Sequence, residues 1–162
     1  MSAPDDIARW CAAALLVAPD GRYLMQLRDA KPTIIIPDHW CLFGGTVEPG
    51  ETAEAALRRE LREELELTPR ELRFFTELCI LLPFAPPRRD RMSFFVVPID
   101  WRDLDAMVQH EGAGRRLFSA EALAAEPRMA PWDACAVVMH ARSAALFAPP
   151  ARMGGKRGDD AK

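Results

Sequence analysis

Residues 45–67 read GTVEPGETAEAALRRELREELEL, and this stretch decides most of what the sequence predicts. Residues 53–65 are strong helix formers without an internal Gly or Pro. Thr52 can cap the N-terminus of such a helix, and Pro49-Gly50 supplies a turn before it. We therefore expect a helix over residues 53–65.

The expected helix has an apolar stripe beside an acidic face. Two sets of side chains define them: Leu57, Leu61 and Leu65 on the apolar stripe, and Glu60, Glu63 and Glu64 on the acidic face. Like charges three or four residues apart repel, and Arg59 can pair with only part of the cluster. Mg²⁺ or Mn²⁺ would remove that repulsion, since hard cations take oxygen ligands and Mg²⁺ is usually held by one or two carboxylates plus substrate phosphates.

The residues that precede the helix favour a metal site over a merely solvated helix. A charge run such as RRELREEL, taken alone, usually faces water. Here it follows the segment WCLFGG at residues 40–45, which we interpret as a turn. Gly44 and Gly45 would let the backbone turn sharply and approach an ion or a phosphate. Together with Glu51, this pattern predicts a divalent-metal phosphate site.

The pattern resembles that of the Nudix hydrolase family: Gly, five residues, Glu, seven residues, Arg-Glu, an aliphatic residue, any residue, Glu-Glu, any residue, Gly and an aliphatic residue. Residues 45–67 match every position except Glu66, where the family has Gly. Gly at a helix C-terminus commonly adopts the left-handed conformation, so this departure concerns the following turn more than the metal site. The resemblance implies one Nudix domain over residues 1–147, folded as an α/β/α sandwich with a mixed β-sheet between helices.

The resemblance also implies roles for individual residues. The implied metal ligands are one backbone carbonyl and three carboxylates: Gly44, Glu60, Glu63 and Glu64. Either Glu60 or a more distant carboxylate would act as general base, while Glu51 would orient Arg59 and the loop. These groups suit phosphoanhydride cleavage, which requires neutralised phosphate oxygens, an aligned water and a stabilised leaving phosphate.

Further candidates lie outside residues 45–67. Glu111 opens EGAGRRLFS, which resembles the oxidised-nucleotide triphosphatase branch of the family, where a Glu at this place binds metal or activates water. Arg28 stands where that branch has a phosphate-binding arginine. Trp132 and Asp133 lie where some family members read a base edge, using a stacking face and a hydrogen-bond acceptor. Ordinary structural roles remain the alternatives: a loop acid, a surface arginine, and a helix-terminal Asp beside a core Trp.

Length and composition agree with one domain that binds a small molecule. The 162 residues, 49% of them hydrophobic, suffice for one core, and a net charge of −3 creates no basic field for nucleic acid or an anionic membrane. The four cysteines form no CxxC pair, which argues against a disulfide framework and a zinc site. The start is acidic and the apolar run 11–18 is too short to span a membrane. We expect a cytoplasmic monomer or homodimer.

The remaining elements follow from local patterns. Strands are expected at residues 11–18, 22–28, 73–83, 92–99 and 115–118, and helices after Ser119 and over residues 131–147. Residues 31–38 should form a loop or short edge strand, and residues 103–108 are too few to assign. The loop FAPPRRDR contains Arg88, Arg89 and Arg91, which we interpret as a solvated hairpin tip. The alternative is a basic loop that contacts a phosphate or a neighbouring subunit. Residues 148–162 have the composition of a disordered tail.

The sequence thus predicts a Mg²⁺-dependent pyrophosphohydrolase, with Mn²⁺ as a substitute, acting on a small-molecule nucleotide derivative. It would cleave the phosphoanhydride of a nucleoside diphosphate linked to another group. That substrate would be a nucleoside triphosphate, oxidised or not, or a nucleotide sugar, because loops outside residues 45–67 set specificity. The alternative is a Nudix-like nucleotide-binding or regulatory module without catalysis, against which the presence of all three helix carboxylates argues.

Overall fold

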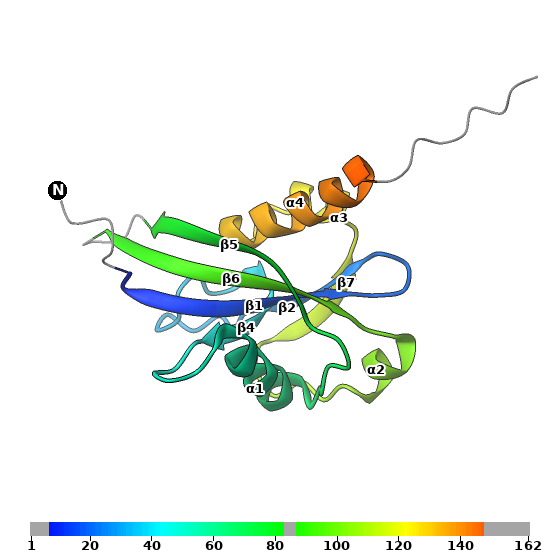
Figure 1. The fold of residues 1–162 in the computed structure, drawn as a ribbon, viewed down its shortest axis with the longest axis horizontal. Coiled ribbons are helices and arrows are strands. Elements are labelled where there is room, and N and C mark those ends of the chain that lie inside the picture. Colours follow the sequence, from blue (N-terminus) through cyan, green and yellow to red (C-terminus); the bar gives the residue numbers. More distant parts are fainter. Residues whose placement is uncertain (1–6, 83–86, 148–162) are drawn as a thin grey trace, which may run out of the picture.

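A seven-stranded mixed sheet separates two layers of helices in the computed structural model, which describes residues 7–82 and 87–147 (Figure 1). The strands are Arg9–Val17 (β1), Tyr23–Leu27 (β2), Trp40–Cys41 (β3), Phe43–Thr46 (β4), Arg73–Leu82 (β5), Arg88–Pro98 (β6) and Gly114–Phe118 (β7). The helices are Ala53–Leu65 (α1), Trp101–Ala106 (α2), Ala120–Ala125 (α3) and Pro131–Phe147 (α4). This arrangement confirms the expected α/β/α sandwich.

Strand β1 lies at the centre of the sheet. The strand order is β3-β2-β1-β6-β5, with β4 also paired to β1 and β7 to β2. β1 runs parallel to β6 and antiparallel to β2 and β4. Its apolar run is covered on both faces, as expected for a central strand: Ala12, Ala14 and Leu16 face one core cluster, and Ala13 and Leu15 face the other.

Each face of the sheet is covered by its own helices. Figure 1 shows α1 and α2 below the sheet and α3 and α4 above it. Helix α1 has the predicted bounds, and its N-cap Thr52 accepts a hydrogen bond from the Ala55 amide at 3.1 Å. The predicted apolar stripe, Leu57, Leu61 and Leu65, is fully buried against the sheet.

The C-terminus of α1 contains the one departure from the family pattern. Glu66 adopts the left-handed conformation, with φ 54° and ψ 23°, that a glycine would adopt there more easily. Its amide donates to the Arg62 carbonyl at 3.0 Å, and its carboxylate lies 2.8 Å from His110 Nε2. The turn geometry is therefore kept without glycine, and the Glu66 side chain contacts the segment that carries Glu111.

Two local expectations were wrong. Residues 40–45 form β3 and the start of β4 instead of a turn, because the backbone pairs with β2 and β1. Strand β6 begins at Arg88, so Arg88, Arg89 and Arg91 belong to a strand and not to a hairpin tip. Residues 103–108, which were too few to assign from the sequence, overlap α2. Asp100 is the N-cap of this helix and forms a capping box with Asp103. The tail expected at residues 148–162 lies outside the described residues.

The cysteines are free thiols: Cys41 is buried, Cys11 is half-buried, and Cys79 and Cys135 are exposed. Within residues 7–82 and 87–147, none of the helices is both long enough and apolar enough to cross a bilayer.

Candidate active site

Arg59 organises the acidic face of α1. Its guanidinium forms two hydrogen bonds of 3.0 Å with Glu51, one of 2.8 Å with Glu60, and one of 3.1 Å with the Thr46 carbonyl. The contact with Glu63 is longer, at 3.4 Å. The Arg59 hydrogen bonds hold the pKa of Glu51 below its usual value. The expected ion pair between Glu51 and Arg59 is thus present, and it connects the loop before α1 to the helix.

The two glycines of β4 allow close contact with the sheet and with α1. The position of a β-carbon at Gly45 is taken by the Glu60 carboxylate. A β-carbon at Gly44, whose φ is 138°, would collide with the backbone of Ala12 in β1. Glycine is required for steric reasons at position 44, whereas the lack of a side chain at Gly45 leaves room for the Glu60 carboxylate against β4.

Glu64 is the buried carboxylate of the cluster. Its side chain points toward β4, where Oε2 accepts a hydrogen bond from the Gly44 amide at 3.3 Å. Burial, followed by the charges of Glu60 and Glu111, raises the pKa of Glu64 to about 8. Concentrated negative charge at a low-dielectric position is the electrostatic condition under which a cation binds favourably.

The segment between α2 and β7 brings Glu111 to α1. The His110 amide donates to the Glu64 carbonyl at 2.9 Å, and the Val108 amide donates to the Leu65 carbonyl at 3.2 Å. On the other side, the Gln26 side chain donates to the Glu111 carbonyl at 3.2 Å. The structure therefore places Glu111, 47 positions after Glu64 in the sequence, within electrostatic reach of the acidic face.

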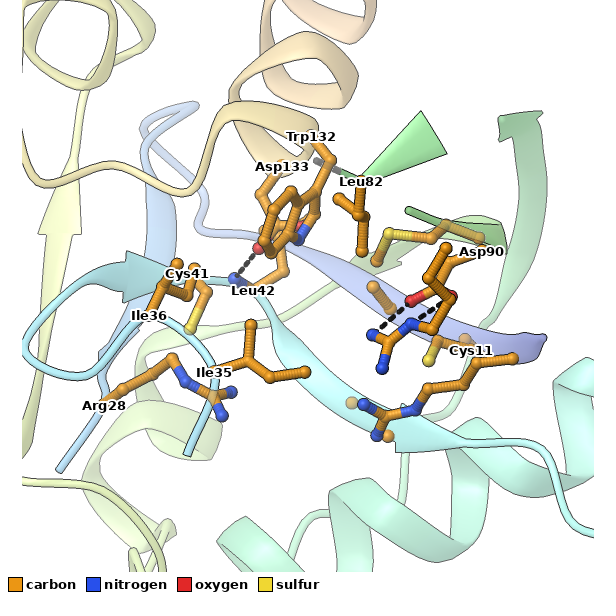
Figure 2. A pocket seen from close by; sticks show the side chains of 17 residues that line it. Cys11, Arg28, Ile35, Ile36, Cys41, Leu42, Leu82, Asp90, Trp132 and Asp133 are labelled. Carbon is orange, nitrogen blue, oxygen red and sulfur yellow. Dashed lines mark hydrogen bonds and ion pairs between the residues drawn. The ribbon is translucent and has the colours of Figure 1, made fainter. Parts of the chain in front are cut away.

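A pocket opens on the side of β4 that faces away from α1 and toward α4 (Figure 2). Its lining includes Gly44 and Gly45 from β4 and Trp132 and Asp133 from the first turn of α4. Figure 2 shows Arg28 at one side of this pocket and Asp90 and Cys11 at the other. All three substrate residues predicted from the sequence therefore line the same pocket: Arg28, Trp132 and Asp133.

Two polar atoms of this pocket are buried without a hydrogen-bond partner in the described part of the chain. Asp133 Oδ2 accepts from the Leu42 amide at 2.9 Å, but Asp133 Oδ1 is unpaired. Burial raises the pKa of Asp133 to about 7. The other atom is Arg28 Nε, which lies near the buried Cys41 thiol. Unpaired buried polar atoms are costly, so both are candidates for bonds to a ligand.

The donor set of the acidic face fits a hard divalent cation. Across the two described segments, no three carboxylate, imidazole or thiol groups converge into a ready-formed metal cluster. Mg²⁺ does not require one, because it commonly uses one or two carboxylates and completes its shell with phosphate and water. Glu60, Glu64 and Glu111 supply oxygen donors, whereas the Glu63 side chain is 59% exposed and faces solvent beside Arg59.

Sequence reasoning missed the end of the pocket opposite Arg28. This end is lined by side chains from the starts of β1 and β6: Arg9, Cys11, Arg88 and Asp90. Parallel pairing of these two strands aligns Arg9 with Asp90 across a separation of 81 positions. The alternation Arg88, Arg89, Asp90, Arg91 is compatible with a strand, but no local pattern indicates which strand lies beside it.

The fold is a mixed sheet between helices, and carboxylates from one helix pack against a strand that contains two glycines. This arrangement defines a class of small α/β proteins suited to phosphate chemistry. The family model of the NUDIX domain matches residues 8–138, so the chain belongs to the Nudix hydrolase family. Nucleoside triphosphatase NudI of Escherichia coli O1:K1 is 48% identical over 61 residues, which cover 33% of this chain and 43% of that protein. The match thus spans less than half of that relative.

Solved structures agree on the fold. The MutT protein from Methanosarcina mazei Go1 superposes with a TM-score of 0.69 and 16% identity, covering 87% of this chain and 98% of that one. The E. coli ORF135 protein superposes with a TM-score of 0.66 and 27% identity, covering 87% and 94%. The fold is therefore shared along nearly the whole length of these proteins.

Proposed function

We propose that this chain is a Mg²⁺-dependent pyrophosphohydrolase that cleaves the phosphoanhydride of a nucleoside diphosphate linked to another group. Its substrate would be a nucleoside triphosphate, with a normal or an oxidised base, or a nucleotide sugar. Membership of the Nudix hydrolase family supports hydrolysis of nucleotide-like substrates. The NudI relatives, which match over 61 residues, are named nucleoside triphosphatases, and this name supports a nucleoside triphosphate as the substrate.

The observation that carries this proposal is the contact between α1 and β4. Glu60 and Glu64 lie against Gly45 and Gly44, and these two glycines also line the pocket that contains Asp133. Carboxylates and pocket therefore share one strand. A phosphate group near Gly44 would be close to the carboxylates while the rest of the ligand occupies the pocket.

The cation would be held by Glu60, Glu64 and Glu111, with Glu63 and the Gly44 carbonyl as further donors. When bound, such an ion supplies charge stabilisation for phosphate oxygens and lowers the pKa of a bound water. Arg59 keeps Glu60 in place through the 2.8 Å bond, and Glu51 fixes Arg59 in turn. Glu60 or Glu111 would accept the proton of the attacking water.

The pocket residues would bind and orient the nucleotide. Arg28 would donate to a phosphate oxygen through its unpaired Nε or its terminal amino groups. Trp132 offers a ring face to a base, and Asp133 Oδ1 offers a buried acceptor, or a donor when protonated, to the base edge. These contacts would fix the distance between the base and the carboxylates.

A screen of nucleoside triphosphates, their oxidised forms and nucleotide sugars with Mg²⁺ tests the proposal. Phosphate would be measured after coupling to inorganic pyrophosphatase or to phosphatase. We expect one class to yield a nucleoside monophosphate, and Glu64→Gln to remove that activity. Nucleotide binding by calorimetry without turnover of any compound would instead identify a non-catalytic binding module.

A further inference from the structure

Strand β4 sets an order of chemical groups across the pocket. Leu42, directly before the strand, contacts Asp133 through its amide. Gly44 and Gly45 follow and contact Glu64 and Glu60. Thr46 ends the strand, about 13 Å from Leu42 at the usual rise per residue. A nucleotide placed along β4 with its base near Asp133 therefore has its phosphates over the glycines and its far end near Thr46.

Arg9 occupies that far end. Its Nε and Nη2 donate to Thr46 Oγ1 at 3.0 and 2.6 Å, and its side chain is half-buried in the pocket lining. Within the described residues, Arg9 forms no ion pair with a carboxylate. A guanidinium has five N–H donors in a planar fork, so a positive charge and further donors remain at this end of the pocket.

The neighbouring charges leave this positive charge in place. Arg88 donates twice to Asp90, both at 2.8 Å, and Asp90 is only 5% exposed. Asp90 is the register partner of Arg9 in the parallel β1–β6 pair, but its two oxygens are directed to Arg88. The Arg88–Asp90 pair is neutral as a unit, so Arg9 adds a positive charge at this end of the pocket. Figure 2 shows Asp90 on the side of the pocket opposite Arg28.

We propose that Arg9 binds the terminal phosphate of a departing pyrophosphate, so that the chain hydrolyses nucleoside triphosphates in preference to nucleotide sugars. The inference rests on the proposed function and narrows its substrate class. Cleavage over Gly44 and Gly45 leaves the departing group near Thr46. A departing pyrophosphate carries a terminal phosphate that can accept paired hydrogen bonds from a guanidinium, whereas a departing hexose phosphate places neutral hydroxyls there.

The test compares two substrates with the same base, a nucleoside triphosphate and a nucleoside diphosphate hexose. Their kcat/KM values would be measured for the unaltered protein, Arg9→Met and Arg9→Lys. We expect Arg9→Met to lose at least about tenfold on the triphosphate, mainly through KM, as for loss of a charged hydrogen bond, and about twofold or less on the hexose compound. Arg9→Lys should recover part of the loss, because it keeps the charge.

Arg91→Met is the matched control. Arg91 pairs in register with Trp10, stacks 4.4 Å above the Trp10 ring and forms a 2.7 Å ion pair with Glu77. Because side chains alternate along a strand, Arg91 faces the side of the sheet opposite Asp90 and the pocket. This variant removes the same charge from the strand paired with β1, one register position further along, and its kcat/KM on both substrates should change by about twofold or less.

Equal losses on both substrates in Arg9→Met, or no loss on either, would overturn the inference while leaving the proposed function intact. If the hexose compound is not turned over, its inhibition constant replaces kcat/KM. If no anhydride is cleaved, the proposed function fails, and calorimetry with inorganic pyrophosphate and Mg²⁺ tests Arg9 alone. Binding at least about tenfold weaker in Arg9→Met would support the subsite, and unchanged binding would refute it.

Discussion

The two faces of the sheet differ in how their ionisable side chains are paired. On the α1 face, Arg59 is bonded to Glu51 and Glu60, and all these groups lie within one short segment of sequence. On the α4 face, Asp133 and Arg28 each keep an unpaired buried atom, and the contact between Asp133 and Leu42 joins residues 91 positions apart. The Arg59 pairs on the α1 face are assembled by local sequence. The contacts of Asp133 and Arg28 on the α4 face are assembled by tertiary packing and leave polar atoms available to a ligand.

Metal removal should produce the largest effect, because it tests the whole α1 face at once. We expect excess EDTA to abolish turnover and added Mg²⁺ or Mn²⁺ to restore it, with no requirement for zinc, since the donors are all oxygen atoms. The measurement is the rate of phosphate release on the substrate found by the screen. Undiminished hydrolysis in EDTA would remove the metal from the proposed mechanism.

Single carboxylate changes on α1 should come next. Glu60→Gln and Glu64→Gln should each lower kcat by about 10² to 10⁴, the range for loss of a base or a charge-stabilising group. Circular dichroism should be unchanged, because glutamine keeps the shape of both side chains. Full activity of either variant would contradict the assignment of this face as the catalytic one.

The contrast between the faces also explains what could be predicted from the sequence. Helix α1 and its cap Thr52 follow from spacings of a few residues, and the contact of Glu51 with Arg59 follows from the family resemblance; the structure contains all three. The turn expected over residues 40–45 was wrong, because the pairing of β3 with β2 and of β4 with β1 outweighs the conformational freedom of glycine. Long-range pairing decides such segments, and no local pattern encodes it.

The pocket was only partly predictable for the same reason. Arg28 and Asp133 were proposed from the family resemblance, and the structure brings them into one lining. Arg88 was interpreted as part of a solvated tip, yet it lines the pocket through its bidentate bond with Asp90. The sequence did not indicate Arg9 as a pocket residue, because its position depends on the parallel alignment of β1 with β6.

Glu111 and Arg28 allow the two faces to be compared in one experiment. Glu111→Gln should lower kcat by about 10² with little change in KM, because a base or metal ligand acts in the transition state. Arg28→Ala should raise KM more than it lowers kcat, because a phosphate contact is shared by ground and transition states. Steady-state kinetics on one substrate gives both results. The reverse pattern in the two variants would refute both roles and leave the carboxylates of α1 unaffected.

An effect on stability, rather than on catalysis, isolates the α4 face. Burial raises the pKa of Asp133 to about 7, against an ordinary value of 3.8. Between these values the folded state binds more protons than the unfolded state, so the stabilising contribution of Asp133 is complete below about pH 4 and is lost as the pH rises through 7. Asp133→Asn keeps an oxygen for the Leu42 amide but does not titrate.

The free energy of unfolding would be measured with urea in EDTA from pH 4.5 to 7.5 for both proteins. As the pH rises across this range, the free energy of unfolding of the unaltered chain should fall relative to that of the variant by on the order of 2 to 4 kcal/mol. The reason is that each pKa unit corresponds to about 1.4 kcal/mol. Asp20→Asn is the control: Asp20 is exposed and hydrogen bonds from Arg22 lower its pKa, so its small effect should have the opposite sign. A difference between Asp133→Asn and the unaltered chain that does not vary with pH would mean that Asp133 is ionised at low pH in the folded state. Asp133 would then carry a charge in the folded state before any ligand binds.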